Sequence, residues 1–86
     1  MVELRFTPSF EKEYKKVIKG NVPLRKRITK QLFVLQKNAN HPSLRLHKIK
    51  NSKYWSISID KSIRVLILFE KRWIYVYHIG KHEDVY

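Results

Sequence analysis

Four histidines are the side chains in this sequence best suited to proton transfer at neutral pH, namely His41, His47, His78 and His82. The unperturbed pKa of histidine lies close to physiological pH, so its imidazole can act as a base or as an acid. The chain also carries 19 Lys and Arg residues, whose charges can stabilise a phosphate in a transition state. These residue types together are the ones that cleavage of a phosphodiester bond without a metal ion requires.

Metal-free cleavage of RNA needs three kinds of group. A base deprotonates the ribose 2′-OH, cations stabilise the charge that develops around phosphorus, and an acid protonates the 5′-oxygen that leaves. His, Arg, Lys and Tyr can supply all of them, whereas DNA lacks the 2′-OH and cannot follow this route. Spacing alone also fits a structural role, with His47 as a surface residue of a basic strand and His82 as a polar residue of the tail.

One short stretch combines cations with aromatic rings. It contains Arg45, His47, Lys48 and Lys50, followed by Tyr54 and Trp55. Cations neutralise phosphates and aromatic rings stack on bases, so this stretch is a candidate nucleic-acid surface whose affinity should fall with salt. The lysines of the predicted helices have a simpler interpretation as a solvated outer face.

Charge indicates the class of partner. Nineteen Lys and Arg against seven Asp and Glu give 19 − 7 = +12 over 86 residues, which is enough chain for a single domain, residues 1–86. Such an excess favours a polyanionic partner. A membrane surface is the competing use of this charge, but the apolar stripes of both predicted helices are needed to cover a sheet, so no amphipathic face remains for lipid.

Composition excludes several other classes. Because the chain has no Cys, disulfides, Cys-based zinc sites and thiol nucleophiles are absent. The histidines make a poor metal site without supporting carboxylates, so we expect no metal and no cofactor. No apolar run approaches the roughly 18 residues of a membrane span. The alternating N-terminus, with Glu3 and Arg5 between apolar residues, is unlike a signal peptide, and we expect a cytoplasmic protein.

Two helices must follow a first short strand. Residues 2–6 alternate apolar and polar, which predicts a half-buried strand. Thr7 then offers an N-cap with Pro8 at the first helical position, and Gly20 suits the end of that helix. Asn21 can cap a second helix that ends near Asn38, and the short connection predicts an antiparallel hairpin.

From Leu44 onward the apolar period changes to two. Four strands are predicted, at Leu44–Lys50, Tyr54–Asp60, Ile63–Glu70 and Trp73–Ile79. Their short connections require antiparallel neighbours. The predicted fold is therefore α+β, with a two-helix hairpin on one face of a four-stranded antiparallel sheet and an N-terminal strand before it. The other face mixes polar and apolar side chains and is where a ligand can lie.

The ordered set of motifs resembles the RelE/ParE superfamily of toxins. The likeness covers the whole chain and rests on the opening strand and helix hairpin, residues 54–60, residues 62–65 and the ending at residues 79–86. The resemblance implies a RelE-like toxin domain of β-α-α-β-β-β-β order. It also implies an endoribonuclease that cleaves mRNA, commonly on the ribosome, and that a cognate antitoxin holds inactive.

The resemblance also implies roles for particular residues. Arg64 matches the strand arginine that binds the scissile phosphate, His82 the basic or histidine position after Gly80-Lys81, and Tyr86 the terminal aromatic residue. His47 resembles the histidine that the YafQ-like branch carries before its Trp-containing strand. The predicted catalytic set is thus His47, Arg64, His82 and Tyr86, and the predicted RNA-binding set is Arg45, Lys48, Lys50, Lys53, Trp55 and Lys81.

The chain also departs from the RelE pattern. Ser56 and Ser58 stand near the positions of two catalytic lysines of RelE, so the histidine-using branch is the better match, with Lys48, Lys50 or Lys53 supplying cations. Two other functions stay open: a ParE-like toxin that inhibits DNA gyrase without nuclease activity, and a non-catalytic module that binds RNA or the ribosome. An acidic antitoxin segment could cover the basic face and compete with RNA.

Overall fold

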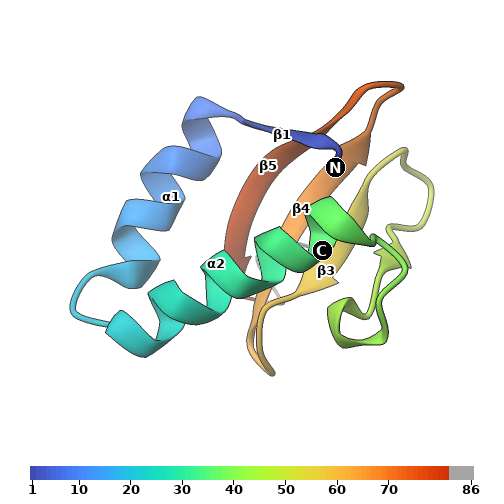
Figure 1. The fold of residues 1–86 in the computed structure, drawn as a ribbon. Helices are drawn as coiled ribbons and strands as arrows, with labels where there is room; N and C mark the ends of the chain where they lie inside the picture. Colours follow the sequence, from blue (N-terminus) through green and yellow to red (C-terminus); the bar gives the residue numbers. More distant parts are fainter. Residues whose placement is uncertain (82–86) are drawn as a thin grey trace.

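A computed structural model of the chain describes residues 1–81 and shows two helices packed against a five-stranded sheet (Figure 1). The elements are β1 (Glu3–Phe6), α1 (Pro8–Ile18), α2 (Val22–Lys37), the 3-10 turn η1 (Pro42–Leu44), β2 (His47–Lys48), β3 (Trp55–Ser58), β4 (Ile63–Phe69) and β5 (Trp73–Lys81). Across the sheet the strands lie in the order β1-β5-β4-β3-β2. The predicted α+β class and the helix hairpin are confirmed.

The helix ends are set by the residues that the sequence indicated. The Thr7 side-chain oxygen accepts a hydrogen bond from the Phe10 N–H at 3.1 Å, and Asn21 Oδ1 accepts one from the Leu24 N–H at 3.1 Å. Gly20 adopts a left-handed φ of 67° just after α1, a conformation that glycine takes without strain. Local chemistry therefore fixes both helix starts and the turn between them.

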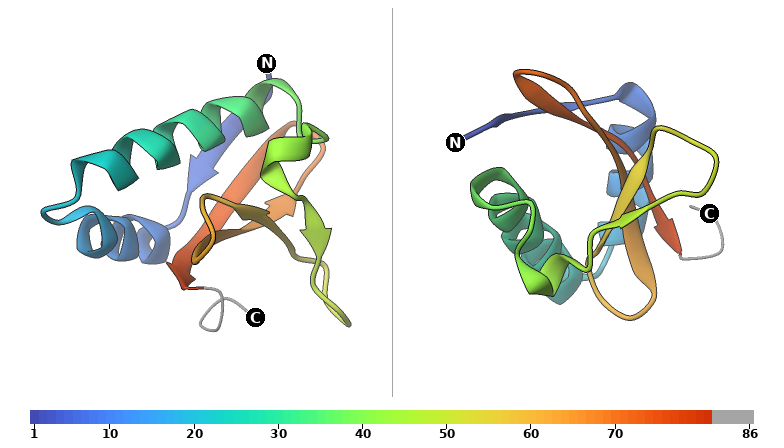
Figure 2. Two further views of the ribbon diagram at one scale, coloured as in Figure 1. Left: turned by 90° about the horizontal axis from the view of Figure 1, so that it is seen from below. Right: turned by 90° about the vertical axis from the view of Figure 1, so that its right-hand side faces the viewer.

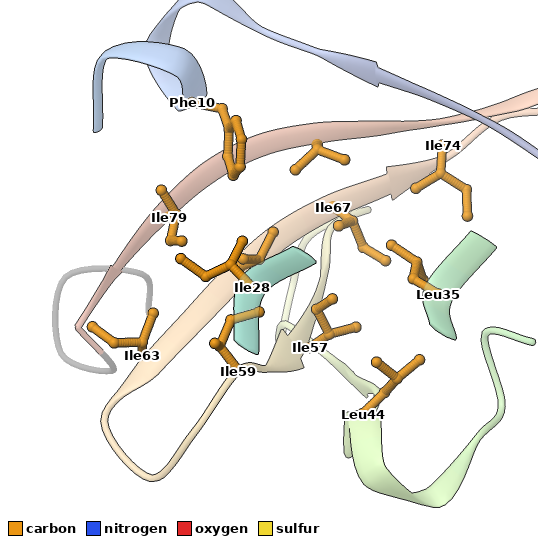
Figure 3. Packing of buried hydrophobic residues seen from close by; sticks show 12 residues of the cluster. Phe10, Ile28, Leu35, Leu44, Ile57, Ile59, Ile63, Ile67, Ile74 and Ile79 are labelled. Carbon is orange, nitrogen blue, oxygen red and sulfur yellow. The ribbon is translucent and has the colours of Figure 1, made fainter. Parts of the chain in front are cut away.

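One hydrophobic core joins α1, α2 and the inner face of the sheet (Figure 3). Ile28 and Leu35 of α2 lie against Ile57 of β3 and Ile67 of β4, and all four side chains are at most 1% exposed. Fully burying such a side chain contributes about 1.5–3 kcal/mol relative to leaving it in water. This face of the sheet is thus closed, and the opposite face is left for function.

The first strand joins the sheet differently from the prediction, because β1 extends it to five strands by pairing in parallel with β5. The pairing ends at Val76, and side chains at the start of α1 cover the next part of the edge. Thr7 Oγ1 donates to the Tyr77 carbonyl at 2.7 Å, and Glu13 accepts from the Ile79 N–H at 3.1 Å. Two backbone groups of β5 beyond β1 are therefore satisfied by side chains of the N-cap and of the helix α1.

The expected strand Leu44–Lys50 is wrong over most of its length. The chain instead forms η1, where His41 Nδ1 accepts from the Ser43 N–H at 3.1 Å, and Arg45 follows with a left-handed φ of 47°. This turn places Leu44, which is 0% exposed, into the core, and only residues 47 and 48 then pair with β3. Figure 2 shows the connection from β2 to β3 projecting from the body of the molecule. Within residues 1–81, neither helix has the length and apolar character to cross a bilayer.

Candidate functional site

The open face of the sheet carries two rows that contain most of its polar residues near β3, because side chains that pair across strands share a face. His47 of β2 is opposite Ser56 of β3, which is opposite Leu66 of β4. In the next row Arg64 of β4 lies between Ser58 and Gly80. The predicted alternation of β3 and β4 is therefore confirmed, and His47 and Arg64 share the face that the helices leave uncovered.

Hydrogen bonds fix the guanidinium of Arg64. Its Nε and Nη2 donate to Ser56 Oγ at 3.1 and 2.9 Å, and Nη2 also donates to the Arg45 carbonyl at 3.1 Å. Ser56 is fully buried, at 0% exposed, whereas Arg64 is half-buried. A cation held in this way loses little conformational entropy when it binds a phosphate, which is the advantage of a preorganised site.

A buried glutamine holds the two sides of this site together. Gln31 of α2 is 6% exposed, and its Nε2 donates to the Ser43 carbonyl at 3.2 Å and to the Ser58 carbonyl at 2.9 Å. Ser43 lies in η1 just before Arg45, so Gln31 ties the turn that positions the Arg45 carbonyl to strand β3. Sequence reasoning missed this residue, although a glutamine three positions after Ile28 on the apolar stripe was a detectable signal.

The two serines have structural partners of their own. Ser56 is the acceptor for Arg64, and the Ser58 hydroxyl donates to the Asp60 carbonyl at 2.9 Å. Neither serine supplies the positive charge that lysine would bring to these positions. The positive charge near the two serines on the open face comes from Arg64, whose guanidinium donates to the Arg45 carbonyl.

Trp55 lies on the opposite face from Arg64. It is directly across from Ile67, packs against the core and contacts the Phe69 ring at 5.9 Å. Its predicted role in base stacking is therefore not supported by its position. Lys48 is opposite Trp55 in the register and points away from the open face as well.

The remaining predicted residues are placed in part. Lys50 and Lys53 are exposed in the connection between β2 and β3, and Lys81 is exposed at the end of β5. His82 and Tyr86 lie outside the described residues. Within residues 1–81 no group of three or more His, Cys, Asp or Glu side chains could hold a metal ion.

The open face continues from His47 and Arg64 into an aromatic surface along β5. Tyr54 contacts Tyr77 at 5.3 Å between ring centroids, Tyr77 contacts Tyr75 at 5.8 Å, and Tyr75 contacts Trp73 at 6.0 Å. Next to Tyr77, His78 Nδ1 lies 3.1 Å from a carboxylate oxygen of Glu13 on α1. Trp73, Tyr75 and Tyr77 alternate along β5 and so share a face by the strand period, a signal that the sequence analysis did not use.

Neither the known protein families nor the curated proteins include a match to this sequence. Solved structures do match. A metal-bound toxin from Helicobacter pylori has a TM-score of 0.83 at 16% identity, with 100% of both chains covered. The toxin in the DinJ-YafQ complex from E. coli has a TM-score of 0.81 at 11% identity, with 100% of this chain and 99% of that chain covered. For the YoeB-YefM complex from Staphylococcus aureus the TM-score is 0.77 at 21% identity, with 95% and 98% covered. The chain therefore has the fold of the YafQ- and YoeB-type toxins, and the predicted RelE/ParE-like architecture is confirmed.

Proposed function

We propose that this chain is the toxin of a type II toxin–antitoxin system and that it cleaves mRNA through attack of the ribose 2′-OH, without a metal ion. The observation that carries the proposal is the guanidinium of Arg64, which Ser56 and the Arg45 carbonyl hold on the open face, where Ser56 is also the residue that pairs with His47. A net charge of +12 supports a polyanionic substrate.

Each residue has a specific task in this proposal. Arg64 binds the scissile phosphate and stabilises the charge that develops there during attack. His47 and His82 are the candidate proton-transfer groups, one as base and one as acid. Tyr86 orients or stacks on the nucleotide, a role that rests on the sequence resemblance alone.

The proposed partners are a cognate antitoxin, mRNA and the ribosome. The matching structures include two kinds of complex, DinJ with YafQ and YefM with YoeB, which supports an antitoxin partner for this chain. An acidic segment of that antitoxin would neutralise Arg64 and the lysines around it. Binding of RNA and of antitoxin would then be mutually exclusive.

The test is induced expression in growing cells, followed by mapping of message cleavage. Arrest with cleaved message is expected for the natural chain, and loss of one proton-transfer group typically lowers a rate by 10²–10⁴-fold, so His47→Ala and His82→Ala should each abolish arrest. His78→Ala is the matched control, because His78 contacts Glu13 of α1 and has no proposed catalytic role.

Three outcomes would contradict the proposal. Folded His47→Ala and His82→Ala proteins that still arrest growth would remove the assigned roles. Arrest with intact message and inhibited DNA supercoiling would identify a gyrase-directed toxin instead. Binding to RNA with no cleavage, even on translating ribosomes, would identify a non-catalytic module, an alternative that the two serines in place of lysines favour.

A further inference from the structure

A pocket of about 350 Å³ adjoins Arg64 at the edge of the sheet. Its charged lining consists of Arg27, Lys30, Arg45, Lys61, Arg64 and Asp60. The pocket therefore reaches from the open face, which bears Arg64, around the edge of β3 to α2. Apart from Arg45 and Arg64, these charged residues lie outside the sets that the sequence motifs indicated, because the other four come from the second helix and from the turn between β3 and β4.

The pocket exists because β2 is short. β2 pairs only with Trp55 and Ser56, so two carbonyls beyond it have no β2 partner: that of Ser58, at the end of β3, and that of Ile59, in the turn that follows. Side chains of α2 reach them instead, since Gln31 Nε2 donates to the Ser58 carbonyl and Arg27 Nε donates to the Ile59 carbonyl, each at 2.9 Å. These bonds hold the guanidinium of Arg27 at the pocket wall, where its charge adds to that of Arg64.

The charges of the lining are unbalanced. Five cations and one carboxylate give 5 − 1 = +4. Partial burial of Asp60 raises its pKa. Hydrogen bonds from the Ile63 and Ser62 N–H groups, at 2.8 and 2.9 Å, and the charge of Arg27 lower the pKa by more, so it lies below its usual value. The carboxylate is thus already engaged by the turn that it closes.

Lys30 and Lys61 are the adaptable cations of the pocket. Both are exposed, and neither ammonium group forms an ion pair or a side-chain hydrogen bond with the rest of residues 1–81. A lysine ammonium acts as a point charge on a flexible stem, which suits a phosphate whose position varies with sequence. An anion in this pocket would meet fixed charge from Arg27 and mobile charge from the lysines.

We propose that this pocket is a second phosphate subsite, which holds a neighbouring phosphate of the RNA strand whose scissile phosphate lies on Arg64. The inference rests on the proposed function. The pocket is continuous with the candidate site, because both include Arg45 and Arg64. An RNA strand bound at the site carries further phosphates along its backbone, and one of them can enter the pocket. Direct contacts of this kind position a nucleic acid without reading its bases.

The test compares two double variants of equal charge. Lys30→Gln with Lys61→Gln removes the two mobile cations of the pocket, and Lys12→Gln with Lys16→Gln removes two exposed cations of α1 as the control. Both change the net charge from +12 to +10. The probe is single-stranded RNA with 2′-O-methyl riboses, which cannot be cleaved by 2′-OH attack, titrated over a range of salt concentrations.

We expect the pocket variant to reduce the slope of log affinity against log salt by about 1 for each lysine that contacts phosphate. The control should leave that slope nearly unchanged. A dinucleotide has one phosphodiester and should bind both variants equally, because it has no second phosphate to place in the pocket.

Several results would overturn the subsite. One is an equal loss of RNA affinity in the pocket variant and the control, and another is no loss of RNA affinity in either. A third is weaker binding of the cognate antitoxin by the pocket variant with RNA binding unchanged, which would make the pocket an antitoxin surface. If the natural chain itself neither binds nor cleaves RNA, the proposed function fails and the subsite fails with it. Normal RNA cleavage with no difference between the two variants refutes the subsite alone.

Discussion

Replacing Ser56 with alanine should weaken RNA cleavage, because Ser56 holds the guanidinium of Arg64 in place. Ser56 Oγ accepts from Arg64 Nε at 3.1 Å and from Nη2 at 2.9 Å, in a position that is 0% exposed. Hydrogen bonds to a charged group contribute about 1.5–3 kcal/mol. Since about 1.4 kcal/mol corresponds to a tenfold rate change, kcat/KM should fall by about 10- to 150-fold.

The assay measures kcat/KM for cleavage of message in a translation reaction, alongside the free energy of unfolding in urea. Ser58→Ala is the matched control, because the Ser58 hydroxyl donates to the Asp60 carbonyl and not to Arg64. It should keep kcat/KM within about threefold of the natural chain, since its loss leaves Arg64 in place. In an Arg64→Ala background, Ser56→Ala should have little additional effect because the group that it positions is gone.

Full activity of Ser56→Ala would refute this reasoning, since Arg64 would then need no fixed partner. An equal loss in Ser58→Ala would also refute it, because the effect would then belong to the strand and not to the guanidinium. Additive losses in the double variant would show that the two side chains act independently.

The remaining predictions concern stability. Gln31→Leu should lower the free energy of unfolding by about 1–3 kcal/mol for each carbonyl that it leaves unsatisfied, as measured by urea titration. An unchanged urea midpoint would contradict the role given to Gln31. Ile28→Ala, at a residue 0% exposed, should cost about 2–5 kcal/mol, whereas Val22→Ala, at 53% exposed, should stay within about 0.5 kcal/mol, and equal costs would place the core elsewhere. Because the pKa of Asp60 is lowered in the folded protein, its stabilising contribution is complete above the unfolded pKa of 3.8 and is lost as the pH falls through the lower folded pKa. In the Asp60→Asn variant, the thermal midpoint should therefore fall less steeply over that acid range.

Features set by neighbouring residues could be predicted from the sequence. Thr7 and Asn21 cap the two helices through bonds to residues three positions later, so the helix starts could be read directly. The alternation of β4 placed Arg64 on the open face for the same reason, since successive side chains of a strand point to opposite faces. Local periodicity therefore gave both the elements and the face on which the candidate site lies.

Features set by distant parts of the chain could not be predicted in the same way. The parallel pairing of β1 with β5 joins residues about seventy positions apart, and short connections say nothing about such a pair. The left-handed turn at Arg45 breaks a pattern that otherwise reads as a strand, because burial of Leu44 outweighs the alternation. The alternation of residues 54–60 predicts Trp55 on the inner face with Ile57 and Ile59, as observed, whereas its stacking role was inferred from nearby cations, which do not determine the face of a side chain.

The central claim is that the natural chain cleaves RNA through the 2′-OH, and the chemistry of the fragment ends tests it most directly. Message cleaved on translating ribosomes by the purified protein should yield upstream fragments that end in a 2′,3′-cyclic phosphate or its opened form. A single 2′-deoxy substitution at the cleaved nucleotide should block the reaction. A 3′-hydroxyl on the upstream fragment, or undiminished cleavage of the deoxy-substituted message, would contradict the account.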